Sequence, residues 1–447
     1  MTQPPQTPVT SSPLGGATGA RAAAHTPGSA PSSSQDASPD TSPLAPADLP
    51  VAVIGAGAMG TGIAQVAAQA GHPVVLVDSQ PGAAQRAVER LGDTFSRLVA
   101  RGKVAREDAD ATLARITTHT TSDMTTVPPV ALVVEAVVEQ IDVKRVIFRQ
   151  LEEAQSPTTV LATNTSSLSI DAITGVATSG HDAALHGGTS PALAHPGRVI
   201  GLHFFNPPPL MRLVEVVAGA ASDPGVLEDA SALMRAWGKT PVRCASTPGF
   251  IVNRVARPFY GEAQRMVEEG LVDPATLDLT LRRAGFRMGP MELTDLIGQD
   301  VNLAVGESVW HQTGQDPRYA PTAYQRDLVR AGRLGRKTGH GVFRYDDSGA
   351  ALDASPDEAL ADRLVGGPVR TDPVARTLAM LVNEGVDLVH RGEASAEDVD
   401  TAMRLGTNYP KGPFEWLEEI GARTVRAQLE ELDAAYPGGR YRPSEAL

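Results

Sequence analysis

Cysteine is almost absent from this chain, because Cys244 is the single cysteine among 447 residues. An intramolecular disulfide is therefore impossible and a four-cysteine metal site is excluded, which fits a reducing compartment. Aromatic residues make up only 4% of the chain, and no apolar run approaches the ~20 residues that span a bilayer. We therefore expect a cytoplasmic protein without a membrane segment.

Basic residues are also scarce relative to acidic ones, with 39 Lys and Arg against 52 Asp and Glu and a net charge of −13. This balance disfavours binding to nucleic acid or to an anionic membrane. An anionic ligand must instead be held by local basic groups and by backbone amides.

The first 49 residues are rich in Pro, Ser, Thr, Ala and Gly, with no aromatic residue and few charges. Such a composition cannot bury enough apolar surface to offset the entropy of ordering, so we predict a disordered tail over 1–49. The segment lacks the basic and apolar regions of a secretory signal, and it has a single arginine, Arg21. A non-functional tail or a misassigned start is the interpretation.

The ordered part opens with a glycine-rich turn between two apolar strands. The sequence VAVI at 51–54 leads into Gly55, Gly57 and Gly60, then a helix of small residues, then a strand at 73–77 that ends at Asp78. Gly55 permits the tight turn, Gly57 lets the backbone approach a pyrophosphate, and Gly60 lets the helix pack on the strand. Asp78 is spaced to bind the ribose hydroxyls. No arginine follows it to neutralise a 2′-phosphate, which favours NAD over NADP.

Apolar strands and helices continue to alternate, with strands at 132–137 and 160–163 and a helix at 143–154. This pattern predicts an α/β Rossmann-type doubly wound sheet, in which ligands bind beyond the carboxyl ends of the strands. Glu139 and the segment from Asn164 to Ser167 fall at those ends, and Lys144 lies early in the helix that follows Glu139.

His203 and Glu215 each interrupt an apolar run, in GLHFF and LVEVV, with a Pro-rich turn between the two runs. A histidine in such a run is usually a satisfied core residue, but a buried carboxylate needs a partner. A His–Glu dyad meets that need. The carboxylate orients the imidazole, which can then take a proton from an alcohol.

Eight segments resemble the 3-hydroxyacyl-CoA dehydrogenase family in order and spacing, from about Val51 to Tyr345. They are VAVIGAGAMGTGIA, LVVEAVVE, TNTSSLSI, GLHFFNPPPLMRLVEVV, GKTPV, PGFIVNRV, GPMELTDLIG and GRKTGHGVFRY. The resemblance implies NAD-dependent, reversible oxidation of a 3-hydroxyacyl-CoA to a 3-ketoacyl-CoA, in the degradation of fatty acids or of aromatic acids such as phenylacetate.

The resemblance also implies roles for single residues. His203 would be the general base and Glu215 its partner, while Ser166 and Asn253 would hold the 3-oxygen of the substrate. Glu139, Lys144 and Asn164 would line the nicotinamide and ribose side of NAD. Arg101 and Lys103 fall near the position where the family contacts the CoA phosphates, although the match there is poor.

The stretch at 171–198 is longer than the family pattern and is rich in Gly, Ala, Ser and Thr. The stretch contains three histidines, His181, His186 and His195. Histidine is a common metal ligand, but these three are not spaced with an acid on one face of a helix. We therefore predict a surface loop insertion and no metal site.

Helical periodicity begins near Ala245, and the chain after 357 repeats it. Glu262 corresponds to Glu384 at an offset of 122 residues, and Gly289-Pro290 to Gly412-Pro413 at 123. The predicted domains are a Rossmann domain (50–243), an all-α domain in two tandem copies (244–345 and 358–447) and a linker (346–357). Ala375 stands opposite Asn253, so we expect one active site. The copies pair within a monomer or mediate a homodimer.

Two other functions remain open at this point. The fold also serves crystallin-like proteins that bind dinucleotide without catalysis, although such a protein has no need to keep His203 and Glu215. Alternatively, the chain is the dehydrogenase subunit of a multienzyme β-oxidation complex. The Asn408-Tyr409-Pro410 segment is similar to two-copy members that act on 3-hydroxyadipyl-CoA.

Overall fold

The computed structural model describes residues 44, 48–176 and 191–447. The predicted tail therefore lies outside the described residues, apart from Leu44 and positions 48–49. Leu44 is buried in the core, and the carbonyl of Leu49 lies 3.0 Å from Nδ1 of His72. These two contacts precede the first strand, so the part of the chain that packs on the domain begins before Val51.

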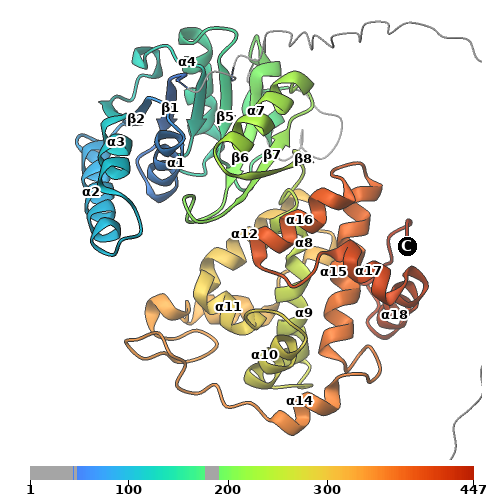
Figure 1. Cartoon of the computed structure of the whole chain (residues 1–447). Helices are drawn as coiled ribbons and strands as arrows, with labels where there is room; N and C mark the ends of the chain where they lie inside the picture. The colour runs from blue at the N-terminus through green and yellow to red at the C-terminus, as the bar shows by residue number, and fades with distance from the viewer. Residues whose placement is uncertain (1–43, 45–47, 177–190) are drawn as a thin grey trace, which may run out of the picture. The chain divides into compact units, whose positions relative to one another are not determined.

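A single eight-stranded sheet forms the first half of the chain (Figure 1), in the order β3-β2-β1-β4-β5-β6-β7-β8. Neighbouring strands are parallel except β6 and β7, which are antiparallel. The strands are β1 (Val51–Ile54), β2 (Val74–Asp78), β3 (Ile116–Thr120), β4 (Leu132–Glu135), β5 (Val160–Thr163), β6 (Val199–Phe204), β7 (Leu213–Ala218) and β8 (Thr240–Ala245).

Helices connect the parallel strands, and the central strands are buried along their whole length because layers cover both faces. The helices of this half are α1 (Ala58–Gln69), α2 (Ala83–Ala100), α3 (Arg106–Ala114), α4 (Ile141–Ala154), α5 (Ile170–Thr174) and α7 (Pro224–Ala236), with 3₁₀ turns η1 (Met124–Thr126) and η2 (Pro196–Arg198). The predicted Rossmann-type sheet is confirmed.

The strand order reverses between β1 and β4, which is where a doubly wound sheet binds its ligand. Gly55 follows β1 with φ +104°, and a Cβ on it would lie 2.7 Å from the carbonyl oxygen of Ala136. A Cβ on Gly60 would lie 1.8 Å from the carbonyl oxygen of Gly55. Both glycines are therefore required for the close approach of α1 to the two central strands.

Two predicted boundaries were wrong. Residues 171–174, which we assigned to the loop insertion, belong to α5, and all five residues of that helix are buried. The two isoleucines of this helix, Ile170 and Ile173, stand beside a sequence of small residues and give too weak a pattern to predict it. His181 and His186 lie outside the described residues. The sheet also extends past 243, because Cys244 and Ala245 pair with Val217 and Ala218.

The second half is helical, and its described residues contain no helix with the length and apolarity needed to cross a bilayer. Its helices are α8 (Val252–Val255), α9 (Arg257–Glu268), α10 (Pro274–Arg283), α11 (Pro290–Ile297), α12 (Gln299–Gln312), α13 (Ala323–Arg330), α14 (Glu358–Leu364), α15 (Pro373–His390), α16 (Ala396–Thr407), α17 (Pro413–Ile420) and α18 (Ala422–Ala435), with η3 (Pro317–Tyr319) and η4 (Arg336–Thr338).

The duplication is visible helix by helix. The continuous helix α15 corresponds to the broken pair α8 and α9, and α16, α17 and α18 correspond to α10, α11 and α12. Helix α14 has no counterpart and packs on α10, where Arg283 binds Glu358 and Asp362. The repeated unit of the second copy therefore begins at Pro373 rather than at 358.

Both copies cap a helix with the same buried acid. In the first copy, Asp278 accepts hydrogen bonds from the backbone N–H groups of Met291 and Glu292 (2.9 and 2.8 Å). In the second copy, Asp400 accepts from Phe414 and Glu415 in the same way. A Cβ on the glycine before either helix would lie within 2.3 Å of the aspartate, so the repeated Gly-Pro and Asp serve folding.

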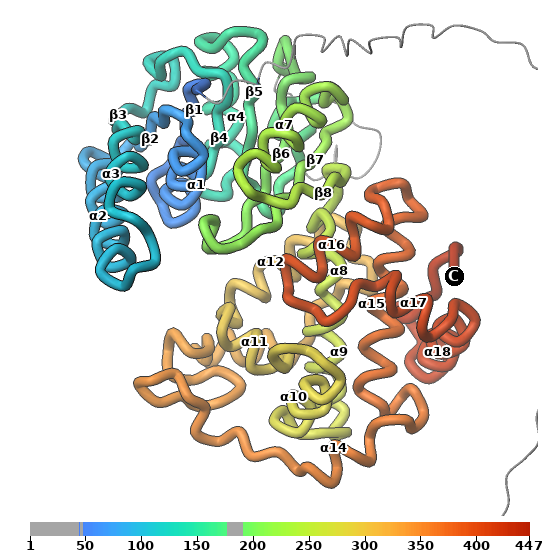
Figure 2. Tube along the Cα trace, viewed as in Figure 1, coloured from blue at the N-terminus to red at the C-terminus, as the bar shows by residue number. Residues whose placement is uncertain are grey.

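Helices α9 and α15 lie side by side (Figure 2), and a fully buried glutamate on each binds the other copy. Glu262 on α9 accepts hydrogen bonds from Arg376 (2.9 Å), Arg440 (2.9 Å) and Tyr441 (2.7 Å), all of which belong to the second copy. Burial alone would raise the pKa of Glu262, but Arg440 and Arg376 together hold it at about 2.

The reciprocal site has the same composition. Glu384 on α15 accepts hydrogen bonds from Arg254 (2.5 Å) and Tyr319 (2.6 Å) and pairs with Arg318 (3.4 Å), all from the first copy. Every one of these residues stands 122 positions from its counterpart in the other site. The two copies are thus joined by an exchange of buried charges that has the symmetry of a dimer interface.

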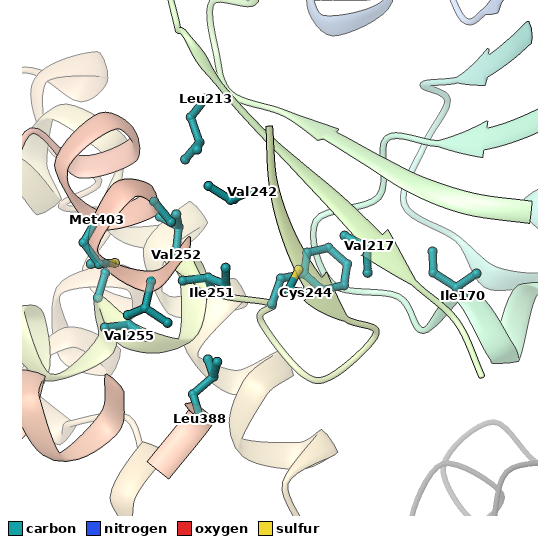
Figure 3. Packing of buried hydrophobic residues seen from close by; sticks show 14 of the residues in the cluster. Ile170, Leu213, Val217, Val242, Cys244, Ile251, Val252, Val255, Leu388 and Met403 are labelled. Atoms are coloured by element: carbon teal, nitrogen blue, oxygen red, sulfur yellow. The ribbon is translucent and has the colours of Figure 1, made fainter. Parts of the chain in front are cut away.

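An apolar cluster continues from the sheet into both helical copies (Figure 3). It includes Ile170 from α5, Leu213 and Val217 from β7, Val242 and Cys244 from β8, Ile251, Val252 and Val255 around α8, Leu388 from α15 and Met403 from α16. Burial, with Glu215 nearby, raises the pKa of the Cys244 thiol, so this cysteine packs as a neutral apolar side chain.

Replacing Glu262 by Gln should lower the free energy of unfolding by about 3–5 kcal/mol, because it leaves buried arginines without their counter-charge. The lowered pKa of Glu262 means that its stabilisation is complete above pH 4.5 and is lost as the pH falls towards 2. The difference in the free energy of unfolding between the wild type and Glu262→Gln, measured with denaturant, should therefore become smaller as the pH falls over that range. Glu430→Gln is the control, since Glu430 is an exposed helix residue. Equal losses in the two variants would contradict this role for the buried pair.

Candidate functional site

The predicted His–Glu dyad is formed by the antiparallel pair β6 and β7. His203 and Glu215 are register partners, and His203 Nδ1 lies 2.6 Å from Glu215 Oε2. Glu215 is fully buried, and His203 is 5% exposed and packs against the rings of Phe205 and Phe250. A carboxylate accepts a hydrogen bond, so Nδ1 carries the proton and Nε2 is the ring atom available for chemistry.

The other oxygen of Glu215 binds the start of the helical half. Its Oε1 accepts hydrogen bonds from the backbone N–H groups of Ile251 (3.1 Å) and Val252 (2.9 Å), at the beginning of α8. The next residue is Asn253, whose Nδ2 donates to the carbonyl oxygen of Ser166 (3.4 Å). The four residues that we predicted to act on substrate are therefore linked by one set of contacts.

The second copy braces this short helix. Arg254, next to Asn253, is 2% exposed and binds Glu384, Asp387 and Glu393, all from the second copy. Burial alone would lower its pKa, but Glu384, Tyr319 and Glu393 raise it well above the usual value. The helix that carries Asn253 is thus fixed by the sheet on one side and by the duplicated domain on the other.

The side chain of Glu139, which follows β4 in the sequence, binds the loop after β5. Its Oε1 accepts hydrogen bonds from the hydroxyl of Thr165 (2.6 Å) and from the backbone N–H groups of Ser166 (2.8 Å) and Ser167 (3.1 Å). Burial alone would raise the pKa of Glu139, but Lys144 and these donors hold it below its usual value. Glu139 is therefore charged at neutral pH and fixes the loop that carries Ser166.

Lys144 is buried, with 1% exposure, and it binds two carboxylates. Its Nζ lies 2.7 Å from Glu135 and 3.4 Å from Glu139. Glu135, at the end of β4, also accepts a hydrogen bond from the Thr163 hydroxyl (2.7 Å). Asn164 accepts one from the backbone N–H of Phe204 (2.8 Å), which ties the end of β5 to the residue after His203.

A cleft of about 860 Å³ opens at the switch point of the sheet. Gly55, Gly57 and Asp78 line it, whereas Gly60, Glu139, Lys144 and Asn164 do not. A Cβ on Gly57 would meet no atom within 4 Å, so this backbone faces open space at the start of α1. Asp78 accepts a hydrogen bond from the backbone N–H of Ala56 (2.8 Å) and ends β2 beside this turn. An open glycine at a helix N-terminus beside an acid fits a dinucleotide with its pyrophosphate and ribose.

A second cavity, of about 530 Å³, lies between α1, α2 and the turn that joins β6 to β7. Arg90 lines it together with the Pro207–Leu210 segment. Arg101 and Lys103 are exposed in the turn after α2 and are not among its lining residues.

Sequence reasoning missed Glu135 and the arginines that join the two copies. Glu135 interrupts an apolar strand in LVVEAV, which is the same signal that identified Glu215 in LVEVV. Arg254 and Arg376 stand at the offset of 122 that aligned the two glutamates. A carboxylate in an apolar strand and the repeat offset of 122 residues are therefore the two patterns in the sequence that point to these residues.

Two family models match this chain over most of its length. The NAD-binding domain of 3-hydroxyacyl-CoA dehydrogenases matches residues 50–247, and the C-terminal domain of the same enzymes matches twice, at 249–345 and 373–447. The chain belongs to the 3-hydroxyacyl-CoA dehydrogenase family. It is an NAD-dependent oxidoreductase, and the resemblance stated from its motifs is confirmed.

Relatives with this architecture cover nearly the whole chain. The 3-hydroxyadipyl-CoA dehydrogenase of Escherichia coli K12 is 40% identical in an alignment that covers 89% of this chain and 96% of that protein. The crystal structure of a 3-hydroxybutyryl-CoA dehydrogenase from Escherichia coli K12 matches with a TM-score of 0.77 and 39% identity, over 89% of this chain and 97% of that one. The mitochondrial hydroxyacyl-coenzyme A dehydrogenase of Sus scrofa is 38% identical over 66% of this chain and 90% of its own. All three are named dehydrogenases, which favours the enzyme over the non-enzymatic, crystallin-like alternative.

Two glycine variants should separate cofactor binding from folding. Gly57→Ala should melt like the wild type, because φ is −71° there and the added Cβ meets no atom within 4 Å. Its affinity for NAD should fall at least ~10-fold, since the methyl group enters the space over which a pyrophosphate packs. Gly60→Ala should instead unfold at lower temperature, because its Cβ would lie 1.8 Å from a carbonyl oxygen. Wild-type NAD binding by Gly57→Ala, measured by titration, would contradict the assignment of the cleft.

Proposed function

We propose that this dehydrogenase oxidises the 3-hydroxyl group of a 3-hydroxyacyl-CoA, with His203 as the general base. The observation that carries the proposal is the 2.6 Å contact between His203 Nδ1 and a fully buried Glu215. The carboxylate keeps the Nδ1 proton in place, so Nε2 accepts the proton of the 3-hydroxyl group. Bound NAD supplies the acceptor for the hydride that leaves C3. The imidazolium that forms is stabilised by Glu215, and in the reverse direction it is the general acid.

Ser166 and Asn253 would hold the oxygen at C3. The support for this role is that the Asn253 amide contacts the Ser166 backbone, and that α8 begins on the same carboxylate that orients His203. Fixing both donors to the base limits the motion of the oxygen relative to Nε2, which favours proton transfer in the bound complex.

On the cofactor side, we propose that Gly55, Gly57 and Asp78 contact NAD directly and that Gly60 acts through helix packing. The carboxylate of Asp78 suits the ribose hydroxyls and repels a 2′-phosphate. Lys144 and Asn164 would be positioning residues, since Lys144 holds Glu139 and Asn164 holds the backbone beside His203. Glu139 would orient the loop at 165–167 towards the nicotinamide.

The CoA part of the substrate would lie along the cavity between α1 and α2. This cavity adjoins the Pro207–Leu210 turn, which connects the strand of His203 to that of Glu215, and Arg90 offers a cation to a phosphate. Arg101 and Lys103, at the end of the same helix, would extend the positive charge outward.

We also propose that the chain works with its own two copies paired, in the cytoplasm. The exchange of Glu262 and Glu384 between the copies satisfies both buried charges within one chain. A second chain is therefore not needed to complete the interface.

The acyl chain would end in a carboxylate. The relative with 40% identity over 89% of this chain is named a 3-hydroxyadipyl-CoA dehydrogenase, and it shares the two-copy length. A place in phenylacetate degradation would follow from such a substrate.

Removing the proposed base should greatly reduce turnover and leave the binding of NAD unchanged. His203→Ala should lower kcat roughly 10²–10⁴-fold, the range for a lost general base, with NAD affinity unchanged. Glu215→Gln should lower kcat as strongly at nearly wild-type stability. Its carbonyl can still accept from α8, but its amide donates to Nδ1 and shifts the ring proton to Nε2. Stopped-flow NADH formation and NAD titration measure these effects. Near-normal turnover of either variant would refute the dyad.

The wild-type enzyme should form NADH with 3-hydroxybutyryl-, 3-hydroxyhexanoyl- and 3-hydroxyadipyl-CoA, with the highest kcat/KM on the dicarboxylic substrate. Steady-state rates of NADH formation, measured at equal enzyme concentrations, give this order. NAD binding without turnover on any of the three would contradict the proposed reaction. Turnover with a preference for the methyl-ended chains would contradict only the proposed chain end.

A further inference from the structure

A cavity of about 240 Å³ lies between the two helical copies and is distinct from the two clefts described above. Phe259, Phe286 and Leu293 of the first copy and Tyr409 of the second form apolar walls. The ring of Tyr409 packs 5.2 Å from Phe259 and 5.1 Å from Phe286. These rings give a rigid surface suited to a short hydrocarbon chain.

Two polar side chains also line this cavity, Arg287 from the first copy and Asn408 from the second. Arg287 has no carboxylate partner among the described residues, although the arginines just before it do. Arg282 pairs with Glu292, and Arg283 pairs with Glu358 and Asp362. Arg287, which is exposed to solvent, thus brings to the edge of this cavity a guanidinium that no described carboxylate pairs with.

Asn408 ends α16 in the left-handed conformation, with φ 55°. This conformation turns the chain back, so that Asn408 and Tyr409 reach the cavity from the second copy. An amide donor and a guanidinium, one from each copy, suit the two oxygens of a carboxylate.

The walls of the cavity continue into segments that reach α8, the helix that carries Asn253. Gly406, just before its wall, packs so closely that a Cβ there would lie 2.8 Å from Leu213 and 2.9 Å from Val252, the neighbour of Asn253. On the other wall, Phe259 follows Asn253 by six residues, or ~9 Å at the rise of an α-helix. That distance is of the order spanned by a few methylene groups together with a long arginine side chain.

We propose that this cavity receives the far end of the acyl chain and that Arg287, with Asn408, binds a carboxylate there. The inference rests on the proposed function, and it narrows the substrate class to 3-hydroxyacyl-CoAs of about six carbons with a terminal carboxylate. A methyl-ended chain gains only the apolar contacts. The second copy, which lacks a substrate-holding asparagine, supplies half of the specificity site.

The test compares 3-hydroxyadipyl-CoA with 3-hydroxyhexanoyl-CoA, which has the same length but ends in a methyl group. Arg287→Met should lower kcat/KM on the dicarboxylic substrate roughly 10- to 100-fold, mainly through KM, because the contact is made equally in ground and transition states. Activity on 3-hydroxyhexanoyl-CoA should stay within about twofold. Arg287→Lys should recover part of the loss, since it keeps the charge without the bidentate geometry.

Asn408→Gly removes the amide while glycine adopts the same backbone, and it should raise KM for the dicarboxylic substrate several-fold. Arg282→Met is the matched control, because Arg282 is a neighbouring surface arginine that pairs with Glu292.

Four results would overturn the inference. Arg287→Met could lose activity equally on both substrates, or keep the full preference for the dicarboxylic one, in which case the dehydrogenase function stands and the carboxylate site falls. If the wild type oxidises 3-hydroxyhexanoyl-CoA but not 3-hydroxyadipyl-CoA, the site is likewise refuted. If it oxidises neither, the proposed function fails along with it.

Discussion

The burial of the Glu215 carboxylate is the constraint on which the rest of the molecule depends. A charge with no solvent contact must have each oxygen satisfied, and the two partners come from different halves of the chain. One oxygen faces His203 in the sheet, and the other accepts the first N–H groups of α8. The orientation of the His203 ring and the docking of the helical half are therefore coupled through this one carboxylate.

The duplicated domain extends this dependence. Glu262 and Glu384 are fully buried, and each finds its arginine and tyrosine partners in the opposite copy. Neither copy alone can satisfy its own glutamate, so the pairing is enforced by the cost of an unpaired buried charge. The two sites are not equal in effect, because Arg254 is next to Asn253 whereas its counterpart Arg376 follows Ala375. The same interaction braces the helix that carries Asn253 in one copy and only an interface in the other.

Much of this architecture could be predicted from short-range patterns. The glycine turn, the alternation of strands and helices and the apolar runs around His203 and Glu215 are local, and the antiparallel strand pair follows from the Pro-rich turn between them. The arginine exchange could not be reached in this way, because Arg254 and Glu384 are 130 residues apart and each looks like an ordinary charged helix residue. Helix α5 was missed for a different reason. Its five residues are too few for periodicity, and the sequence that follows is rich in small residues, so the composition alone does not mark where a helix stands.

Net charge says little about how this protein meets its anionic ligands. The chain carries a charge of −13, yet both the CoA ester and a carboxylate end are anions. What matters is which cations are left after internal pairing. The carboxylates at the interface between the copies pair with Arg254, Arg318, Arg376 and Arg440, and surface carboxylates pair with Arg282 and Arg283. Arg287 pairs with none of the described carboxylates, and its exposed side chain lines the cavity between the copies. An acidic protein can thus bind an anionic ligand through a local cation, because net charge does not describe the potential at a single site.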